Sequence, residues 1–334
     1  MKKILLWNIL LLLCQYGVAQ VDSLTNGLKG QIIRAIEQSP SSPNIFYAGL
    51  KGSALGTGTV YKSTDAGQTW HSLNGGLPLD PYVADIQAIA ESNTPERTLW
   101  AGTWKNGLFR SRDGGRSWQK DVHFPSSDIR SIRMGVQNPK LIYASTSAFG
   151  VVKSMDGGIN WKRSPAALID STFNFAWNIE LDPRDDNVIY AQTFGDGVWK
   201  SIDQGAHWTQ VLDTEGKVCW DMRISEDAND IWVATSKRGD TLSAVYHSVD
   251  FGDTWKEISG IPQIGVNQIN VVQSGTKKIL YVGSWQDGVY KLENETWTKV
   301  AEVDFDGIAH LLVHENKTLV GSWGNGVYII DDSE

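Results

Sequence analysis

The segment "SRDGGRSW" (residues 111–118) places a hydroxyl, a carboxylate, two glycines and a tryptophan within eight positions, and it recurs along the chain. The other copies are "STDAGQTW" (63–70), "SMDGGINW" (154–161), "SIDQGAHW" (201–208) and "SVDFGDTW" (248–255). The tryptophans that end these boxes lie 43 to 48 residues apart, and a weaker sixth copy ends at Trp297. A period in the forties is typical of one propeller blade per repeat.

Each repeat contains four short apolar segments with an alternation of period two, separated by turn residues, which predicts four strands. The seventh repeat supplies only three, in "GIAHLLVH", "TLVGSW" and "GVYIID". Residues 20–28, "QVDSLTNGL", resemble the closing segment "TWHSLNGGL" of the first repeat. We therefore predict an all-β, seven-bladed β-propeller of four-stranded antiparallel blades, a single domain over residues 20–334, with an N-terminal strand completing the last blade.

The box itself has the composition of a turn between the third and fourth strands of a blade. Gly115 can adopt the positive φ of a tight turn, and Asp113 can accept hydrogen bonds from nearby backbone N–H groups. Trp118 is large enough to be buried between neighbouring sheets. Five copies spread around a ring favour this structural role over catalysis, and one carboxylate per box is too few for a calcium loop.

The five boxes match the signature S/T-x-D-x-G-x-T/S-W, so the chain resembles Asp-box (BNR) repeat propellers along essentially its whole mature length. This group includes sialidases, xyloglucanase-type glycoside hydrolases, the sortilin luminal domain and photosystem II assembly factor-like propellers. Similarity in size and layout to the assembly factor-like group implies a binding or assembly role. Sialidases of this class have six blades and an "RIP" motif that is missing here. Xyloglucanase-type enzymes take one catalytic Asp from each of two propellers, so their pair is not carried over.

The first 19 residues have the features of a secretory signal peptide. Lys2 and Lys3 precede the apolar run "ILLWNILLLLC", and Ala19 fits a cleavage site. A lipid anchor at Cys14 is disfavoured because Leu13 stands where a small residue is required. No later apolar run is long enough to cross a bilayer, so we expect a secreted or periplasmic protein without a membrane span.

The charge and cysteine content exclude several classes of function. The formal charge of -8 becomes -10 without Lys2 and Lys3, which argues against nucleic acid as a partner. Only Cys219 remains in the mature chain, so no internal disulfide is possible. The glycines of "GSALGTG" (52–58) do not precede a helix, and no metal or nucleophile motif occurs. We expect a monomer with no cofactor and no metal.

A second repeated motif lies in the predicted hairpins between the second and third strands, on the face opposite the boxes. It reads "TWKNGLF" (103–109), "TFGDGVW" (193–199), "SWQDGVY" (284–290) and "SWGNGVY" (322–328), and its Asn-Gly or Asp-Gly pair is a hairpin signal. The equivalent positions of the seven blades are Lys51, Trp104, Ser147, Phe194, Ser236, Trp285 and Trp323. Two interpretations stay open: the aromatic rings fill gaps between blades, or they form stacking platforms around a central cleft.

The innermost strands add polar groups. Alignment on their apolar positions predicts one level formed by Ile33, Ile86, Ile129, Asn178, Asp221, Gln268 and Ile308. Two residues further along it predicts Ala35, Ala88, Ser131, Glu180, Arg223, Asn270 and His310. Asp85, Asp128, Trp177, Trp220 and Asn267 come just ahead of the first level, with Arg34, Gln87 and Arg130 between the two levels.

The polar members gather in blades four to seven, where either channel water or a ligand can satisfy them. The predicted ligand-binding residues are Trp104, Trp177, Glu180, Phe194, Trp220, Asp221, Arg223, Trp285, His310 and Trp323.

The sequence favours a secreted module that binds a glycan or a protein ligand on the face opposite the boxes. The alternative is a carbohydrate-active enzyme: a glycoside hydrolase of the sialidase or xyloglucanase type, or a polysaccharide lyase. Asp85, Asp128, Glu180 and Asp221 are available for an acid pair, but their separation does not follow from sequence, so no catalytic residue is assigned.

Overall fold

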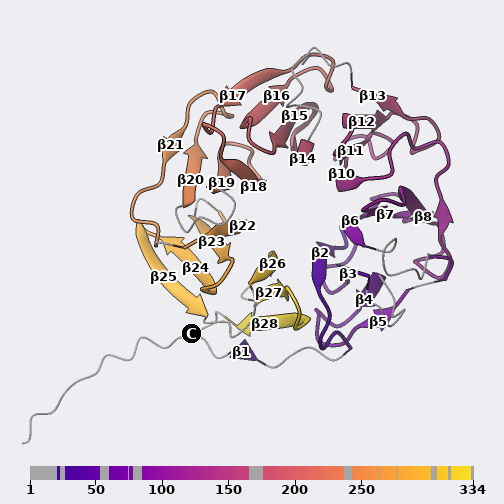
Figure 1. The fold of residues 1–334 in the computed structure, drawn as a ribbon, viewed down its shortest axis with the longest axis horizontal. Coiled ribbons are helices and arrows are strands. Elements are labelled where there is room, and N and C mark those ends of the chain that lie inside the picture. The colour runs from indigo at the N-terminus through magenta and orange to yellow at the C-terminus, as the bar shows by residue number, and fades with distance from the viewer. Residues whose placement is uncertain are drawn as a thin grey trace, which may run out of the picture.

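The chain folds into a ring of seven sheets around a central axis (Figure 1). The computed structural model describes residues 21–22, 27–52, 60–73, 75–77, 85–164, 176–236, 243–262, 264–275, 277–301, 307–314 and 317–331. Every sheet in this part of the chain has four antiparallel strands, and no helix occurs in it. The predicted all-β, seven-bladed propeller is confirmed.

The first four blades follow one another along the chain, each running from the axis to the rim. Blade 1 consists of β2 (Ile33–Gln38), β3 (Phe46–Leu50), β4 (Val60–Ser63) and β5 (His71–Ser72). Blade 2 consists of β6 (Ile86–Glu91), β7 (Leu99–Thr103), β8 (Leu108–Ser111) and β9 (Gln119–Lys120). Blade 3 consists of β10 (Ile129–Met134), β11 (Ile142–Thr146), β12 (Gly150–Ser154) and β13 (Lys162–Arg163). Blade 4 consists of β14 (Ala176–Asp182), β15 (Asp185–Thr193), β16 (Val198–Ser201) and β17 (Thr209–Leu212).

The last three blades complete the ring. Blade 5 consists of β18 (Val218–Ile224), β19 (Ile231–Ser236), β20 (Ser243–Ser248) and β21 (Lys256–Glu257). Blade 6 consists of β22 (Val266–Ser274), β23 (Lys277–Ser284), β24 (Val289–Glu293) and β25 (Thr296–Ala301). Blade 7 consists of β26 (Ile308–His314), β27 (Lys317–Ser322), β28 (Val327–Asp331) and β1 (Val21–Asp22).

Blade 7 takes its outer strand from the start of the described chain. Val21 of β1 pairs with Ile330 of β28, and Asp22 pairs with Ile329, in antiparallel register. The two segments lie side by side in Figure 1, as predicted from the likeness of residues 20–28 to a closing segment. The predicted signal peptide and Cys14 lie outside the described residues. In the part that is described, no helix is long and apolar enough to span a membrane.

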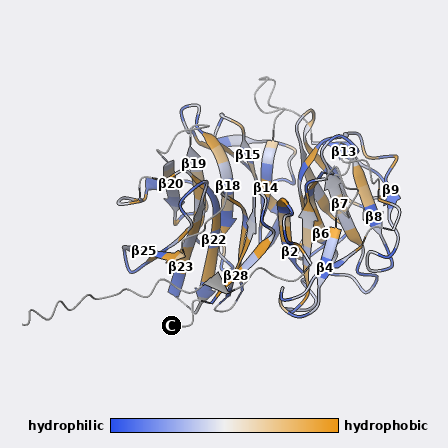
Figure 2. Ribbon diagram, turned by 60° about the horizontal axis from the view of Figure 1, so that its bottom comes forward, coloured by the Kyte–Doolittle hydropathy of each residue, from blue (hydrophilic) through white to orange (hydrophobic). Residues whose placement is uncertain are grey.

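The core is divided into layers between neighbouring blades, and the strands carry most of the hydrophobic residues (Figure 2). The second strand of a blade approaches the innermost strand of the next one closely. A Cβ atom built on Gly102 would lie 2.5 Å from the Cγ2 atom of Ile129, so only glycine fits there. Gly49, Gly283 and Gly321 allow the same close approach in blades 1, 6 and 7.

The box turns are closed in the way that their composition predicts. Ser111 donates a hydrogen bond to Asp113 (2.7 Å) and accepts one from the Gly115 N–H (2.8 Å), and Gly115 has a φ of 90°. Hydrogen bonds from Ser117, and then from Ser111, lower the pKa of Asp113 to about 2. The indole of Trp118 is buried and donates to the Leu73 carbonyl of the preceding blade (2.8 Å). The same serine-to-aspartate bond recurs in the other four boxes.

Every innermost strand contains a β-bulge at the same place, with one residue that has no partner on the second strand. The seven bulge residues are Arg34, Gln87, Arg130, Trp177, Trp220, Asn267 and Ala309. A bulge interrupts the alternation of side chains, so a pattern read across it loses its register.

The predicted alignment of the innermost strands is wrong for three blades because of these bulges. Ala176, Cys219 and Val266, and not Asn178, Asp221 and Gln268, are the counterparts of Ile33. The level after the bulge is formed by Ala35, Ala88, Ser131, Asn178, Asp221, Gln268 and His310. The level below it, called here the floor ring, is formed by Glu37, Ala90, Arg133, Glu180, Arg223, Asn270 and Leu312.

Candidate functional site

A cavity of about 1280 Å³ opens around the axis at the end of the ring opposite the boxes. The third strand of a blade connects the two ends of the ring. In blade 2, β8 begins after the hairpin that carries Trp104, at the cavity end, and it ends at Ser111, the first residue of a box, at the opposite end. All ten predicted ligand-binding residues line this cavity: Trp104, Trp177, Glu180, Phe194, Trp220, Asp221, Arg223, Trp285, His310 and Trp323.

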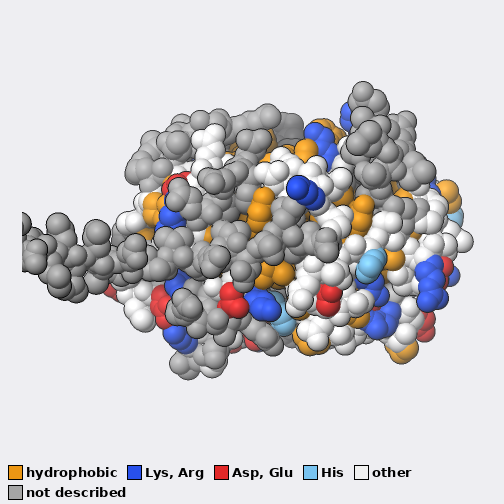
Figure 3. Space-filling model, turned by 90° about the horizontal axis from the view of Figure 1, so that it is seen from below, with side chains coloured by type: hydrophobic (Ala, Val, Ile, Leu, Met, Phe, Trp, Pro, Cys, Tyr) orange, Lys and Arg blue, Asp and Glu red, His pale blue; other side chains and the backbone are white. Residues whose placement is uncertain are grey.

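Figure 3 shows one side of the ring. Among the side chains coloured by type on that side, Lys and Arg lie among Asp and Glu, and hydrophobic side chains form only small groups.

The aromatic residues of the hairpins occupy equivalent structural positions, as the repeated Asn-Gly and Asp-Gly motif predicts. The Trp104 N–H donates to the Asp85 carbonyl (2.9 Å), and Trp285 and Trp323 make the same backbone bond to Gly265 and Gly307 of their own blades (2.9 and 3.2 Å). Each ring is thus fixed at the point where the innermost strand of its blade begins.

The aromatic rings form a continuous arc over blades 4 to 7. Trp177 lies 5.6 Å from Phe194 and 5.7 Å from Trp220, between ring centroids. Trp220 lies 5.2 Å from Trp285, which lies 5.8 Å from Trp323. These distances are in the range of favourable ring–ring contacts.

The two interpretations of these aromatics apply to different rings. Trp220 is 9% exposed and its indole N–H donates to Ser236 Oγ (2.6 Å), so it fills space between blades. Trp104 and Phe194 are each 37% exposed. These two therefore present ring surface to anything that enters the cavity.

Arg34 of blade 1, Trp104 of blade 2 and Arg130 of blade 3 continue around the cavity mouth. The Arg34 guanidinium lies 4.3 Å from the centroid of the Trp323 ring, and Arg130 lies 5.2 Å from Trp104 and 5.1 Å from Trp177. Arg34 also pairs with Asp85 (3.3 Å). These cation–π contacts, together with the Arg34–Asp85 ion pair between blades 1 and 2, extend the aromatic arc into a belt around the cavity mouth.

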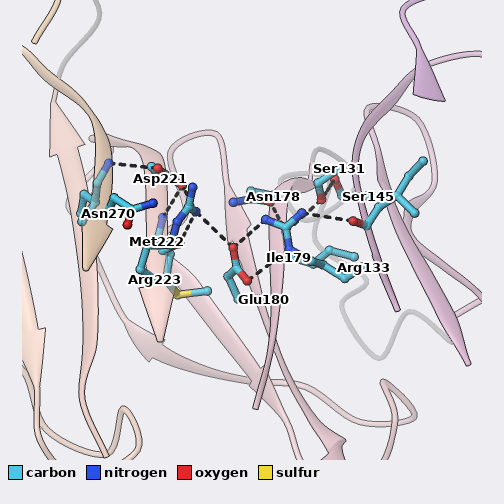
Figure 4. Close-up of polar contacts among 12 residues, drawn as sticks. Ser131, Arg133, Ser145, Asn178, Ile179, Glu180, Asp221, Met222, Arg223 and Asn270 are labelled. Atoms are coloured by element: carbon cyan, nitrogen blue, oxygen red, sulfur yellow. Dashed lines mark hydrogen bonds and ion pairs between the residues drawn. The ribbon is translucent and has the colours of Figure 1, made fainter. Parts of the chain in front are cut away.

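The floor of the cavity contains a chain of ion pairs (Figure 4). Glu180 accepts two hydrogen bonds from Arg133 (2.7 and 3.2 Å) and one from Arg223 (3.2 Å). Arg223 also bonds to Asp221 (2.6 Å), whose other oxygen accepts the backbone N–H of Ile269 (3.0 Å). Burial raises the pKa of Asp221, although Arg223 opposes that rise. The structure thus brings Glu180, Asp221 and Arg223 together, as the sequence indicates.

Two other titratable groups that line the cavity, one in the floor ring and one on the level above it, have no ion pair in the described structure. Burial raises the pKa of Glu37 to about 7, and the nearby Arg133 reduces that rise. Burial, followed by the positive charges of Arg223 and Arg133, lowers the pKa of His310 to about 3. Its Nδ1 atom is buried and has no hydrogen-bond partner among the described residues. At neutral pH His310 is therefore neutral, and Glu37 is poised between its two forms.

Sequence reasoning missed Glu37 and Arg133 because its alignment slipped at the bulges. An alignment without gaps would have found them. The segments "IRAIE" (33–37), "IRSIR" (129–133), "AWNIE" (176–180) and "CWDMR" (219–223) share an Ile or Met in fourth place and a charged residue in fifth place. That fifth place is the floor ring.

Metal and thiol chemistry find little support in the residues that the structure describes. Among them, no group of three or more His, Cys, Asp or Glu side chains is arranged to hold a metal ion. Burial raises the pKa of Cys219 to about 12, so its thiol stays protonated and is not a nucleophile.

No protein-family model and no curated protein matches the chain. Among solved structures, an ancestral GH74 enzyme has a TM-score of 0.75 and 18% identity, covering 93% of this chain and 46% of its own. The GH74 xyloglucanase from Xanthomonas campestris has a TM-score of 0.71 and 16% identity, covering 93% and 53%. YCF48 bound to D1 peptide has a TM-score of 0.65 and 16% identity, covering 96% and 98%. The chain spans about half the length of these GH74 structures, and the likeness shows the propeller fold.

Proposed function

We propose that this chain is an exported Asp-box propeller, released near Ala19, that binds a glycan or a protein ligand in the cavity opposite the boxes. The observation that carries the proposal is the belt of aromatic and arginine side chains around a cavity of about 1280 Å³. Ligand sites are concave, largely apolar and lined by a few fixed polar groups, and this cavity has those properties.

The state of the carboxylates favours binding over catalysis. Asp85 is held by Arg34, Glu180 by two arginines, and Asp221 by Arg223 and a backbone N–H. A carboxylate that serves as nucleophile or base needs a free oxygen directed at the substrate. The paired acids instead hold the cavity floor in one arrangement.

The similar structures are compatible with either kind of ligand. One is named a xyloglucanase, and another was solved with a bound D1 peptide. At 16% identity neither name transfers to this chain, so the proposal rests on the cavity.

The proposal is tested by screening the purified protein against arrays of polysaccharides, sialosides and peptides. Ligands that bind are then titrated against Trp104→Ala and Phe194→Ala, which remove exposed rings from the cavity. Ile202→Ala is the matched control, because Ile202 is 71% exposed but lies in a box. We expect each cavity variant to weaken binding at least fivefold and the control to leave it unchanged. Equal binding by all three would refute this site.

A glycoside hydrolase is the second candidate, because Glu37 and Glu180 lie in unlike environments. Glu180 is paired with two arginines, whereas Glu37 has no ion pair among the described residues and burial raises its pKa to about 7. Carboxyl groups in unlike environments are typical of acid and nucleophile pairs. Release of reducing sugar from any polysaccharide of the screen, abolished by Asp221→Asn or Glu37→Gln, would replace the binding-only function with this one.

A further inference from the structure

The floor ring pairs its charges from one blade to the next. Arg133 of blade 3 pairs with Glu180 of blade 4, and Glu180 pairs with Arg223 of blade 5. These residues occupy equivalent positions on successive innermost strands. The partner of a floor residue is therefore the residue at the same level of the neighbouring blade.

Glu37 of blade 1 breaks this rule. Its two neighbours at the same level are Ala90 of blade 2 and Leu312 of blade 7, and neither can pair with a carboxylate. No ion pair of Glu37 occurs in the part of the chain that the structure describes, although the residue lines the cavity. On the level above, Ala35 and Ala88 add only methyl groups to the lining.

The other charges near Glu37 are compensated within the protein. Glu180 and Asp221 balance the charges of Arg133 and Arg223 on the neighbouring strands of blades 3 to 5, and Glu91 of β6 pairs with Arg97. The nearest titratable group that β26 directs at the cavity, His310, is neutral at physiological pH. Tyr47 of β3 keeps its hydroxyl proton, because burial raises its pKa. An ionised Glu37 would thus be the one uncompensated charge among these groups.

We propose that the space beside Glu37 is a subsite for a basic side chain, lysine or arginine, of a peptide ligand. The inference rests on the proposed binding function and specifies its ligand. The entering cation takes the position that Arg133 or Arg223 takes beside Glu180, and completes the charge pairing of the floor ring. An unpaired, half-buried carboxyl is costly to ionise, and an ammonium or guanidinium group beside it lowers that cost.

The depth of the subsite favours a long side chain. Glu37 lies three residues along β2 from Arg34 in the belt, which corresponds to about 10 Å of strand. A lysine or arginine can reach down while its backbone stays among the aromatic rings. An amino sugar carries its ammonium group directly on the ring, so the whole ring would have to descend.

The proposal couples binding to a proton. When the cation binds, Glu37 changes from carboxylic acid to carboxylate, and its proton passes to solvent. Because burial places the pKa of Glu37 at about 7 in the free protein, affinity should increase about tenfold for each unit by which the pH rises toward 7, and should level off above pH 8. Lysine stays charged over this whole range.

The test uses the full protein and two peptides: Gly-Gly-Lys-Gly-Gly with both ends blocked, and the same peptide with its lysine acetylated. Binding is followed by the fluorescence of the cavity tryptophans at pH 5.5, 7 and 8.5. Calorimetry in buffers of unlike ionisation enthalpy counts the protons released at pH 6.5. We expect the lysine peptide to bind at least tenfold more tightly than the acetylated one at pH 8.5, with release of up to one proton.

The decisive variant is Glu37→Gln, which keeps the shape of the side chain and removes its ionisation. It should lose at least tenfold in affinity at pH 8.5, together with the pH slope and the proton release. Glu257→Gln, which makes the same charge change on the exposed strand β21, should bind like the parent protein. Unfolding curves of both variants verify that each is folded.

Failure of this inference differs from failure of the proposed function. Equal binding of the two peptides, or an unchanged Glu37→Gln variant, overturns the subsite but leaves the binding function standing. If a glycan binds in a way that depends on Trp104 and neither peptide binds, the subsite is likewise overturned and the binding function stands. Preference for a glucosamine oligomer that depends on Glu37 overturns the peptide assignment. Only the absence of every ligand in the screen rejects both.

Discussion

The two ends of the propeller are built from the same strands but by opposite rules. At the box end, five turns repeat one hydrogen-bond pattern from serine to aspartate. At the cavity end, one structural position, the bulge, holds Arg34, Gln87, Arg130, Trp177, Trp220, Asn267 and Ala309. The difference indicates that repetition maintains the fold, while the departures from it create a binding surface. The predictions below test this division.

The largest effect on stability is expected for Trp118→Ala. The indole is 4% exposed, packs between blades 1 and 2, and donates to the Leu73 carbonyl. Its removal leaves a cavity between two sheets, which should lower the free energy of unfolding by about 3–5 kcal/mol. Urea denaturation followed by circular dichroism measures the change. A loss below about 1 kcal/mol would show that the boxes are not what holds the blades together.

Glu180→Gln should come next, and it sharpens the comparison because the residue belongs to the cavity end. The substitution leaves Arg133 and Arg223 without their shared carboxylate. Breaking a buried pair from one side should cost about 3 kcal/mol in the free energy of unfolding. The matched control, Glu257→Gln on the rim, should stay within about 0.5 kcal/mol of the parent protein. Equal values for the two variants would mean that the floor ion pairs do not stabilise the ring.

The two ends should also respond to pH in opposite directions. The folded-state pKa of Glu37, about 7, lies above its ordinary value of 4.5, so the stability it contributes is present below pH 4.5 and is lost as pH rises to 7. The loss should be on the order of 1–3 kcal/mol and absent in Glu37→Gln. Asp113 has a lowered pKa of about 2, so its contribution is lost only as pH falls below about 4.

Urea midpoints measured from pH 2 to 9 separate these two effects. Glu37→Gln should flatten the curve between pH 4.5 and 7, and Asp113→Asn should flatten it below pH 4. A fall between pH 4.5 and 7 that persists in Glu37→Gln would assign that titration to another group.

The smallest change in stability is expected for Phe194→Ala. The ring is 37% exposed and its centroid lies 5.6 Å from that of Trp177 and 6.1 Å from that of Trp220. Its removal should cost about 1 kcal/mol or less in the free energy of unfolding, far below the cost of Trp118→Ala. Thermal unfolding of Phe194→Ala and Trp118→Ala in parallel measures the contrast. Equal losses of stability in the two variants would mean that the box end and the cavity end contribute alike to the fold.

The sequence predicts most of the fold because its signals are local. The box motif marks one turn per blade, and the Asn-Gly and Asp-Gly pairs mark the hairpins, so Trp104, Phe194, Trp285 and Trp323 were aligned correctly. The floor of the cavity was predicted only in part. A bulge in each innermost strand breaks the alternation on which the alignment depended, so Glu37 and Arg133 were missed.

Contacts between neighbouring blades could not be predicted either. The ion pair of Arg133 with Glu180 joins positions 47 residues apart, and nothing in either strand alone predicts it. The sequence thus gives the residue types that surround the cavity, and only the structure shows which charges are already paired.

The pairing of β1 with β28 has a consequence for folding. It joins residues about 300 positions apart, whereas the other strand pairs form between neighbours along the chain. The first six blades can therefore form from local contacts, but the seventh is complete only when the two ends of the described chain meet. Until β1 pairs with it, β28 is an open sheet edge at which a strand of a second chain can pair. Completion of the ring is therefore the slow and aggregation-prone step of folding.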